Sequence, residues 1–526
     1  MTNLTKNTNK NIKGNSTNNP NNNVRTRLAP SPTGFAHLGT IYQAMIDKVW
    51  AEKNKGQFVL RIEDTDRNRF VEGAEEVIYE ALNWFKLVPD ESPIHGGDYG
   101  PYRQSERLDI YKRYAQKLID EDKAYYCFCS KERLDEVRKK QQKEGKQPMY
   151  DKHCRYLSEE EIQKNLDSGK PYVIRMKIPE NETIVVQDLI RGDIEFDSNL
   201  VDDQVIVKSD GFPTYHLAVV IDDHLMNITH VIRGPEWITS FPKHKLLYDY
   251  FGWEMPVFVH TPIINNMDGS KLSKRQGHSS VDWYRRKGYL PEAVLNFIAL
   301  LGWSHPEEKE IFDWKEYVKT FDLKDLSAVN PKLDLKKLEW MNGQYMQSLS
   351  NQEFLDKLYD WLTYCIDNEY HGATEYETHW TKQDYIDMFN WLRDLDEDKK
   401  LLFAEINKPR VKVFEDLLPM NNLFIKDYEN NEEFISLLTK YKDLDEIKDH
   451  LRWVLEMLDS SDFSLASLKD IELKVKDSAE EKGWKIMEVF YPIRVVVSGS
   501  KVSPPLFESM FIIGKSGVVD RFKRVV

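Results

Sequence analysis

Two short clusters of residues with the chemistry to hold phosphate stand out in the sequence. The first, residues 30–40, reads PSPTGFAHLGT and lies where a strand-like run meets a helical pattern. Backbone N–H groups and the dipole at a helix N-terminus favour a phosphate. Gly39 permits close approach of the backbone, and His37 can donate a hydrogen bond to a phosphate oxygen. Taken alone, an H-x-G triplet is more often an ordinary turn with a capping histidine.

The second cluster is the basic loop KLSKR, in which Lys271 and Lys274 are three residues apart. It follows the apolar, strand-like run 257–264. A lysine acts as a compact positive charge, so two lysines on one loop suit a polyphosphate. A solvated basic loop is the simpler interpretation of these five residues by themselves.

The four cysteines form a third feature. Cys127, Cys129 and Cys154 are close in sequence and Cys365 is remote, which is not the pattern of a disulfide framework. We therefore expect a reducing, cytoplasmic setting. Three thiols at this spacing suggest a structural zinc site, which needs a fourth ligand. Buried free cysteines are the alternative.

Composition limits the classes that the chain can belong to. The 526 residues are 41% hydrophobic, enough for about three or four folding units. No apolar run reaches the roughly 18 residues of a membrane span, so we expect none. Residues 1–23 are Asn-rich and lack an apolar segment, which predicts a disordered tail rather than a secretory signal. The net charge of −14 disfavours nucleic acid globally, but residues 266–288 carry six basic side chains against two acidic ones.

The elements that must position these clusters follow from apolar periodicity. The first part predicts alternating strands and helices of a parallel α/β unit: strands at 24–28 and 57–62, helices at 38–53, 71–85 and 107–121. Residues from 125 to about 201 look inserted, with a strand-like run at 173–178. The α/β pattern returns at 204–208, 214–221 and 229–232. From about residue 346 the chain is helical, and Ser350 with Glu353 predicts a capping box.

Both phosphate clusters, in this order and each within an α/β half-domain, resemble the two signatures of class I aminoacyl-tRNA synthetases, written HIGH and KMSKS. Longer stretches resemble the glutamyl-tRNA synthetases of the bacterial type more closely. They are RLAPSPTG at 27–34, RIEDTD at 61–66, PTY at 213–215 with Asp222-Asp223, and THVIRG at 229–234. The resemblance covers essentially everything after residue 23.

The resemblance implies a Rossmann-type α/β catalytic domain with an inserted α+β acceptor-binding domain, followed by an all-α anticodon-binding region. We place the first catalytic half at 24–126, the insertion at 127–202 and the second catalytic half at 203–265. A stem-contact region with the KLSKR loop would span 266–345. The helical anticodon-binding region would span 346–526.

The implied activity is glutamate–tRNA ligation: ATP and Mg²⁺ activate L-glutamate as an adenylate, and the glutamyl group passes to the 3′ terminal adenosine of tRNA-Glu. The resemblance gives catalytic roles to His37, Gly39, Lys271 and Lys274. It gives ATP contacts to Pro30, Thr33, His37, Gly39, Thr40, Glu236, Trp237 and Lys274. The glutamate contacts would be Arg27, Ser31, Glu63, Tyr215 and Arg233, with Arg233 on the side-chain carboxylate because a guanidinium prefers a carboxylate to an amide.

Several positions depart from the family pattern. Thr40 replaces the second histidine of HIGH, and Arg275 replaces the last serine of KMSKS; both look usual in glutamyl enzymes. Val219 stands where some members have an asparagine, so it receives no role. Pro235 departs from the commoner residues before the adenosine-binding pair Glu236 and Trp237.

The fourth zinc ligand is left open by the resemblance. Some bacterial relatives have C-x-C…C-x-H, but Tyr156 stands at that histidine. A glutamyl-transfer relative uses Y-x-x-x-C, which matches Tyr150 before Cys154. We therefore expect zinc on Cys127, Cys129, Cys154 and Tyr150, with His153 the second choice.

Three alternatives share parts of the pattern. Glutaminyl-tRNA synthetases have a different first turn and a β-rich C-terminal half; the short glutamyl-queuosine enzymes lack the anticodon region and the lysine loop. An inactive paralogue that binds RNA would be expected to lose His37, Lys271 or Lys274. We expect a monomer. Arg410 aligns loosely with an anticodon-discriminating arginine, and whether tRNA-Gln is also charged depends on that region.

Overall fold

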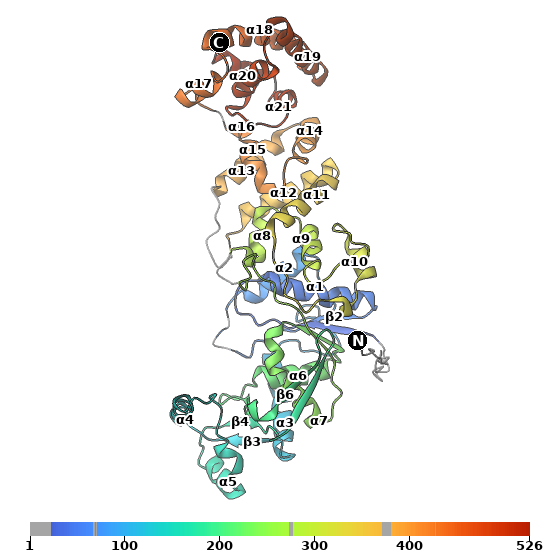
Figure 1. Cartoon of the computed structure of the whole chain (residues 1–526), viewed down its shortest axis with the longest axis vertical. Helices are drawn as coiled ribbons and strands as arrows, with labels where there is room; N and C mark the ends of the chain where they lie inside the picture. Colours follow the sequence, from blue (N-terminus) through green and yellow to red (C-terminus); the bar gives the residue numbers. More distant parts are fainter. Residues whose placement is uncertain (1–22, 67–68, 70, 273–276, 371–379, 427) are drawn as a thin grey trace, which may run out of the picture.

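The computed structural model of the chain describes residues 23–66, 69, 71–272, 277–370, 380–426 and 428–526. The expected tail, apart from Asn23, lies outside these residues. Figure 1 shows an elongated molecule with the inserted region and the strands in its lower half and the C-terminal helices at the opposite end. Within the described residues, no helix is long and apolar enough to cross a membrane.

Two pairs of parallel strands place the motifs quoted above at one edge of a sheet. β1 (Arg25–Leu28) pairs in parallel with β2 (Gln57–Leu60), and β8 (His230–Arg233) pairs in parallel with β9 (Val257–His260). The backbone N–H of Thr229 donates to the carbonyl of Arg25 at 2.9 Å, which joins the two pairs. The carboxyl ends of parallel strands are where α/β folds bind ligands.

Helix α1 (Leu38–Lys53) has the bounds that the sequence predicts. Ile41, Met45 and Val49 are buried at helical spacing, so one face of α1 packs into the core. His37 occupies the N-cap position, which places the first cluster directly at the N-terminus of the helix.

The remaining elements of the expected catalytic half and insertion lie beside and below this sheet, and α4, α5, β3 and β4 lie at the lower end of the molecule (Figure 1). They are α2 (Ala74–Trp84), α3 (Leu108–Asp120), β3 (Ala124–Cys127), α4 (Lys131–Lys143), α5 (Glu159–Asp167), β4 (Val173–Met176), β5 (Thr183–Asp188), β6 (Gly192–Asp197), β7 (Val205–Val207), α6 (Tyr215–Leu225) and α7 (Phe241–Phe251).

Strand pairing crosses the predicted boundary between 127–202 and 203–265. β4 pairs antiparallel with β3 and also with β7, which follows that boundary. The hairpin of β5 and β6 lies before the boundary, yet β5 continues the sheet of β9 through Asp188 and Phe258. Strand edges pair with whichever edge is adjacent in space, so sequence order alone does not separate these two sheets.

The C-terminal half is helical. Its elements are α8 (Val281–Lys287), α9 (Pro291–Ala299), α10 (Trp314–Thr320), α11 (Leu335–Ser348), α12 (Asn351–Asp367), α13 (Lys382–Asp394), α14 (Glu397–Asn407), α15 (Leu417–Met420), α16 (Asn422–Ile425), α17 (Glu432–Leu438), α18 (Leu444–Ser460), α19 (Leu465–Lys482), α20 (Ile486–Ser498), α21 (Leu506–Ile513) and α22 (Lys515–Lys523). The capping box at the start of α12 is confirmed: Ser350 accepts from the N–H of Glu353, and Glu353 accepts from that of Ser350.

Candidate active site

A cavity of about 520 Å³ opens at the carboxyl ends of β1, β2 and β8. Residues from segments far apart in the chain line it together. The predicted site residues among its lining are Arg27, Pro30, Ser31, Thr33, His37, Thr40, Glu63, Tyr215, Arg233 and Trp237. The fold therefore brings most of the expected ATP and glutamate contacts to one place.

The phosphate cluster forms one wall of this cavity. The chain leaves β1 at Leu28, turns through Pro30 and Thr33, and enters α1 after His37. Gly39 lies in the first turn of α1, and a Cβ added to it would meet no other atom within 4 Å. Open space beside exposed N-terminal backbone is what a phosphate needs to approach the helix closely.

A network of buried charges supports the floor of the cavity. Arg27 donates through Nε to Asp223 Oδ1 at 3.1 Å, and Arg61 donates to the same oxygen at 2.8 Å. Arg107 donates to Asp222 at 2.7 Å. Burial opposes the charged form of Asp223, but Arg27 and Arg61 hold the pKa of this carboxyl below its usual range. Such a network fixes Arg27 in position because each charge satisfies another.

Glu63 and Tyr215 face the same cavity. Glu63 accepts from Arg61 Nη2 at 3.1 Å and is buried. Burial raises the pKa of its carboxyl to about 7, against the opposing effect of Arg61 and Arg27. A cation arriving beside Glu63 would favour its ionised form. The ring of Tyr215 lies against that of Trp237, with centroids 4.1 Å apart.

Arg233, at the end of β8, is the second buried arginine of the cavity, and its exposure is only 4%. It donates through Nε to Nε2 of His260 at 2.9 Å and through Nη1 to Nδ1 of His244, also at 2.9 Å. The Tyr215 hydroxyl accepts more weakly from Nη1 at 3.5 Å. Its Nη2 atom is buried and has no hydrogen-bond partner. Burial lowers the pKa of this guanidinium, with Tyr215 opposing the shift. Arg233 therefore lines the cavity with a buried charge, and its Nη2 donor has no hydrogen-bond partner.

Some of the predicted residues do not line the cavity. Gly39, Glu236 and Lys271 are exposed and outside its lining, although Gly39 belongs to the adjoining helix. Lys274 lies outside the described residues. Arg410 is exposed after α14, in the C-terminal helices, where its Nη1 donates to the carbonyl of Ile406 at 2.6 Å.

The three clustered cysteines do come together in the expected insertion. The Sγ atoms of Cys127, Cys129 and Cys154 lie within 4.8 Å of one another. The Tyr150 hydroxyl lies 3.3 Å from the Cys127 sulfur and 3.4 Å from that of Cys129. His153 and Tyr156 are exposed. Three sulfur donors this close together could hold a metal ion that prefers thiolates, such as zinc.

Sequence reasoning gave no role to His244, His260, Asp188 or Asp222. Asp222 belongs to a motif quoted above, so the sequence pointed to this residue but not to the side chains that it contacts. The two histidines lie in α7 and β9 and carry no local motif; only the fold brings them to Arg233.

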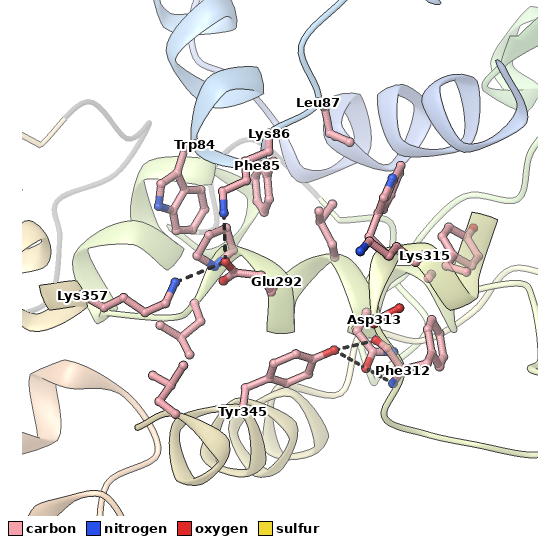
Figure 2. A pocket seen from close by; sticks show the side chains of 18 of the residues that line it. Trp84, Phe85, Lys86, Leu87, Glu292, Phe312, Asp313, Lys315, Tyr345 and Lys357 are labelled. Atoms are coloured by element: carbon pink, nitrogen blue, oxygen red, sulfur yellow. Dashed lines mark hydrogen bonds and ion pairs between the residues drawn. The ribbon is translucent and has the colours of Figure 1, made fainter. Parts of the chain in front are cut away.

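A second cavity, of about 590 Å³, contains none of the predicted residues. It lies where the end of α2 meets α9, α10, α11 and α12. Figure 2 shows Lys86 above Glu292 and Lys357 to its left, and their Nζ atoms lie 3.4 Å and 3.2 Å from Oε1 of Glu292. This cavity marks the junction between the catalytic part and the C-terminal helices.

Two family models match the chain and account for both halves. Residues 23–340 match the catalytic domain of class I tRNA synthetases (E and Q), and residues 353–526 match an anticodon binding domain. With the cavity at the strand ends and the helical C-terminal half, the chain is thus a class I tRNA synthetase.

Full-length relatives narrow the family. The chain is similar to a glutamate–tRNA ligase of Chloroherpeton thalassium, with 43% identity over 96% of this chain and 97% of the relative. It is also 40% identical to one of Fusobacterium nucleatum, over 96% and 97%. The crystal structure of a glutamate tRNA ligase from Elizabethkingia meningosepticum in complex with its amino acid matches with 37% identity and a TM-score of 0.82, covering 95% of this chain and 99% of that one. The chain belongs to the glutamate–tRNA ligase family.

Proposed function

We propose that this protein activates L-glutamate with ATP, releasing pyrophosphate, and transfers the glutamyl group to the 3′ terminal adenosine of tRNA-Glu. Such a reaction asks a protein mainly to position reactants and to neutralise charge. The cavity supplies cations, a helix N-terminus and aromatic rings for these tasks. The observation that carries the proposal is Arg233, a buried cation that lines the cavity and has an unpartnered Nη2 donor.

The glutamate contacts follow from the charges around the cavity. Arg233 would bind the side-chain carboxylate, because its buried charge has no carboxylate in contact among the described residues. Arg27, which pairs with Asp223, would also contact a carboxylate of glutamate. Glu63 would bind the ammonium group of glutamate. Tyr215 and Ser31 complete the proposed pocket.

ATP would occupy the other side of the cavity. Its phosphates would lie along the start of α1, in contact with Pro30, Thr33, His37, Gly39 and Thr40. Mg²⁺, when bound with the nucleotide, supplies positive charge to the phosphate oxygens. We further assign the adenosine to Trp237 and Glu236 and the departing pyrophosphate to Lys271 and Lys274, of which Lys274 lies outside the described residues.

The tRNA would bind along the length of the molecule. We assign its acceptor end to the insertion at 127–202, its stem to 266–345 and its anticodon to 346–526, where residues 353–526 match the anticodon-domain model. Arg410 is proposed as one anticodon contact. We also propose a monomer that works in the cytoplasm.

A structural zinc ion is proposed for the cysteine cluster of the insertion. Cys127, Cys129, Cys154 and the Tyr150 hydroxyl provide the four donors. Bound zinc would supply a crosslink that closes the excursion between Cys129 and Tyr150. That excursion includes α4, which has no buried residue and so little apolar material of its own to fold on.

Glutamate-dependent exchange between ATP and pyrophosphate, measured with and without tRNA, tests the activation step. Charging of purified tRNA-Glu and tRNA-Gln then tests the transfer and its specificity. We expect exchange with glutamate but not glutamine, and charging of tRNA-Glu. Absence of both reactions would contradict the proposed activity and favour an inactive paralogue, and charging of both tRNAs would show a relaxed anticodon preference.

Elemental analysis of protein purified without added metal tests the zinc site. We expect one zinc per chain in the wild type and its loss in Cys127→Ser. The remote Cys365→Ser is the matched control and should keep its zinc. If the wild type contains no zinc, the site is wrong; if Tyr150→Phe keeps full zinc, the fourth ligand is another group.

A further inference from the structure

The two histidines that contact Arg233 distinguish it from Arg27, the other buried arginine of the cavity. Arg27 pairs directly with the Asp223 carboxylate at 3.1 Å. Arg233 instead donates to His260 and His244, and no carboxylate among the described residues forms an ion pair with it. The difference matters because a carboxylate partner neutralises a guanidinium, whereas a neutral imidazole only accepts its hydrogen bond.

The hydrogen bonds determine where the protons of both rings lie. A guanidinium can only donate, so Nε2 of His260 and Nδ1 of His244 must each be unprotonated acceptors. His260 then carries its proton on Nδ1, which lies 2.7 Å from Asp188 Oδ2. His244 carries its proton on Nε2, which lies 3.1 Å from Nδ1 of His216. Each ring therefore has a partner for its N–H, and the two tautomers are opposite.

The surroundings keep the imidazole rings of His244 and His260 neutral and in fixed orientations. Burial lowers the pKa of His260 to about 4, against Asp188, and that of His216 to about 3. It also lowers the pKa of His244, and the charge of Arg233 acts in the same direction. Asp188 is held by further bonds from the backbone N–H groups of His260, at 2.9 Å, and Arg191, at 3.0 Å. The network thus keeps one defined arrangement at neutral pH.

We propose that His244 and His260, the latter oriented by Asp188, are positioning residues that hold the Nε and Nη1 donors of Arg233 without neutralising its charge. Nη2 and the full positive charge then remain for the incoming ligand. The identity of that ligand rests on the proposed function: it is the side-chain carboxylate of glutamate. An amide offers no charge to this site, so the histidine pair is a determinant of the preference for glutamate over glutamine.

The charge argument is tested by two substitutions of the same residue. His244→Glu replaces the neutral acceptor with a carboxylate, and His244→Gln replaces it with another neutral acceptor. For His244→Glu we expect the KM for glutamate to rise at least about 30-fold, because the new carboxylate competes with the substrate. In His244→Glu the KM for ATP should change little, and the preference for glutamate over glutamine should narrow. The KM of His244→Gln for glutamate should be clearly closer to that of the wild type.

Equal effects of the two substitutions on the KM for glutamate would overturn the proposal. Nitrogen-15 NMR of labelled histidine in the wild type provides a second test that does not depend on activity. We expect the Nδ1–H tautomer for His260 and the Nε2–H tautomer for His244, each assigned by the signals lost in its glutamine variant. The opposite tautomer at either ring, or a protonated ring at neutral pH, would also overturn it.

Arg233→Gln separates this inference from the proposed function. If that variant uses glutamate as well as the wild type, Arg233 is not in the pocket and the assignment of the carboxylate fails. If Arg233→Gln loses glutamate use while His244→Glu retains it, only the inference about the histidine pair fails.

Discussion

The catalytic half of the molecule buries charged side chains in contact with one another, whereas the C-terminal helices bury mainly apolar ones. Arg61 is fully buried and donates to both Asp223 and Glu63. Nearby, Asp222 accepts from Arg107 and from the hydroxyl of Tyr111, both at 2.7 Å. These contacts lie directly beneath the cavity that binds the substrates in our proposal.

At the other end, the core of α18–α22 is built from aliphatic and aromatic residues such as Leu451, Val475 and Phe522. The buried Arg521 donates to main-chain carbonyls, including that of Leu423 at 2.7 Å. Burial of apolar area stabilises a fold without directional partners, while a buried ion pair gains little net stability. The catalytic half gains less stability from its buried ion pairs, but these pairs hold in place the charged side chains that the chemistry needs.

The largest expected effect comes from removing one carboxylate of the catalytic network. Asp223→Ala should lower the free energy of unfolding by about 3–5 kcal/mol, because Arg27 and Arg61 would keep buried charges without their partner. Urea denaturation measures this loss. Asp249→Ala is the matched control: its pair with Lys245 is partly exposed, and its loss should cost less than about 1 kcal/mol.

Acid should reduce the difference between wild type and Asp223→Ala. The pKa of Asp223 is lowered in the folded state, so its contribution is complete above the unfolded value of about 3.9. The contribution is lost as the pH falls through the folded value. A gap between the two proteins that widens in acid would contradict this assignment.

Arg233→Gln should affect catalysis more than folding. We expect kcat/KM for glutamate to fall by the equivalent of about 2–5 kcal/mol, because a buried carboxylate would lose its charged partner. Pyrophosphate exchange measures the change. The free energy of unfolding should drop little, since Arg233 has no ionic partner to leave unpaired among the described residues. A large loss of stability with a normal kcat/KM for glutamate would mean that Arg233, like Asp223, serves the fold rather than catalysis.

A smaller gain is expected from Asp47→Asn. Asp47 is fully buried in α1, and neither carboxyl oxygen has a hydrogen-bond partner. Burial raises the pKa of this carboxyl well above its usual value, although Arg27 opposes the shift. Asp47 therefore costs stability that grows as the pH rises above the unfolded value.

Thermal unfolding of the Asp47→Asn protein should show a gain of about 1 kcal/mol at alkaline pH. The gain should disappear in acid, where Asp47 is protonated in both states. Equal gains at all pH values would mean that packing, and not ionisation, is responsible.

The smallest effect is expected at the junction between the two halves. Glu292 is 39% exposed at its side chain and accepts from Lys86 and Lys357. Glu292→Gln should lower the free energy of unfolding by less than about 1 kcal/mol, because exposed ion pairs are screened by solvent. Thermal unfolding at low and high salt measures it, and the difference should vanish at high salt. A loss comparable to that of Asp223→Ala would show that the junction also depends on buried charge.

The local patterns predicted local structure well. The apolar spacing of residues 38–53 predicts α1 at its observed bounds, since a helix face is a property of a short segment. Ser350 and Glu353 predict the start of α12 because a capping box is closed within four residues. Strand ends were less certain: the run at 257–264 was expected to be extended, and β9 ends at His260.

What the sequence by itself determined, then, was the elements, the family resemblance and which residue types carry the chemistry. Only the tertiary structure decided which partner each charged side chain has. Arg27 pairs with Asp223, 196 positions along the chain, and His260 with Asp188, 72 positions away. For the same reason, the ring partners of Arg233 are two imidazoles, and no carboxylate in the described part of the chain forms an ion pair with it. Contacts across such separations depend on how strands and helices pack, and no short segment contains the information that specifies them.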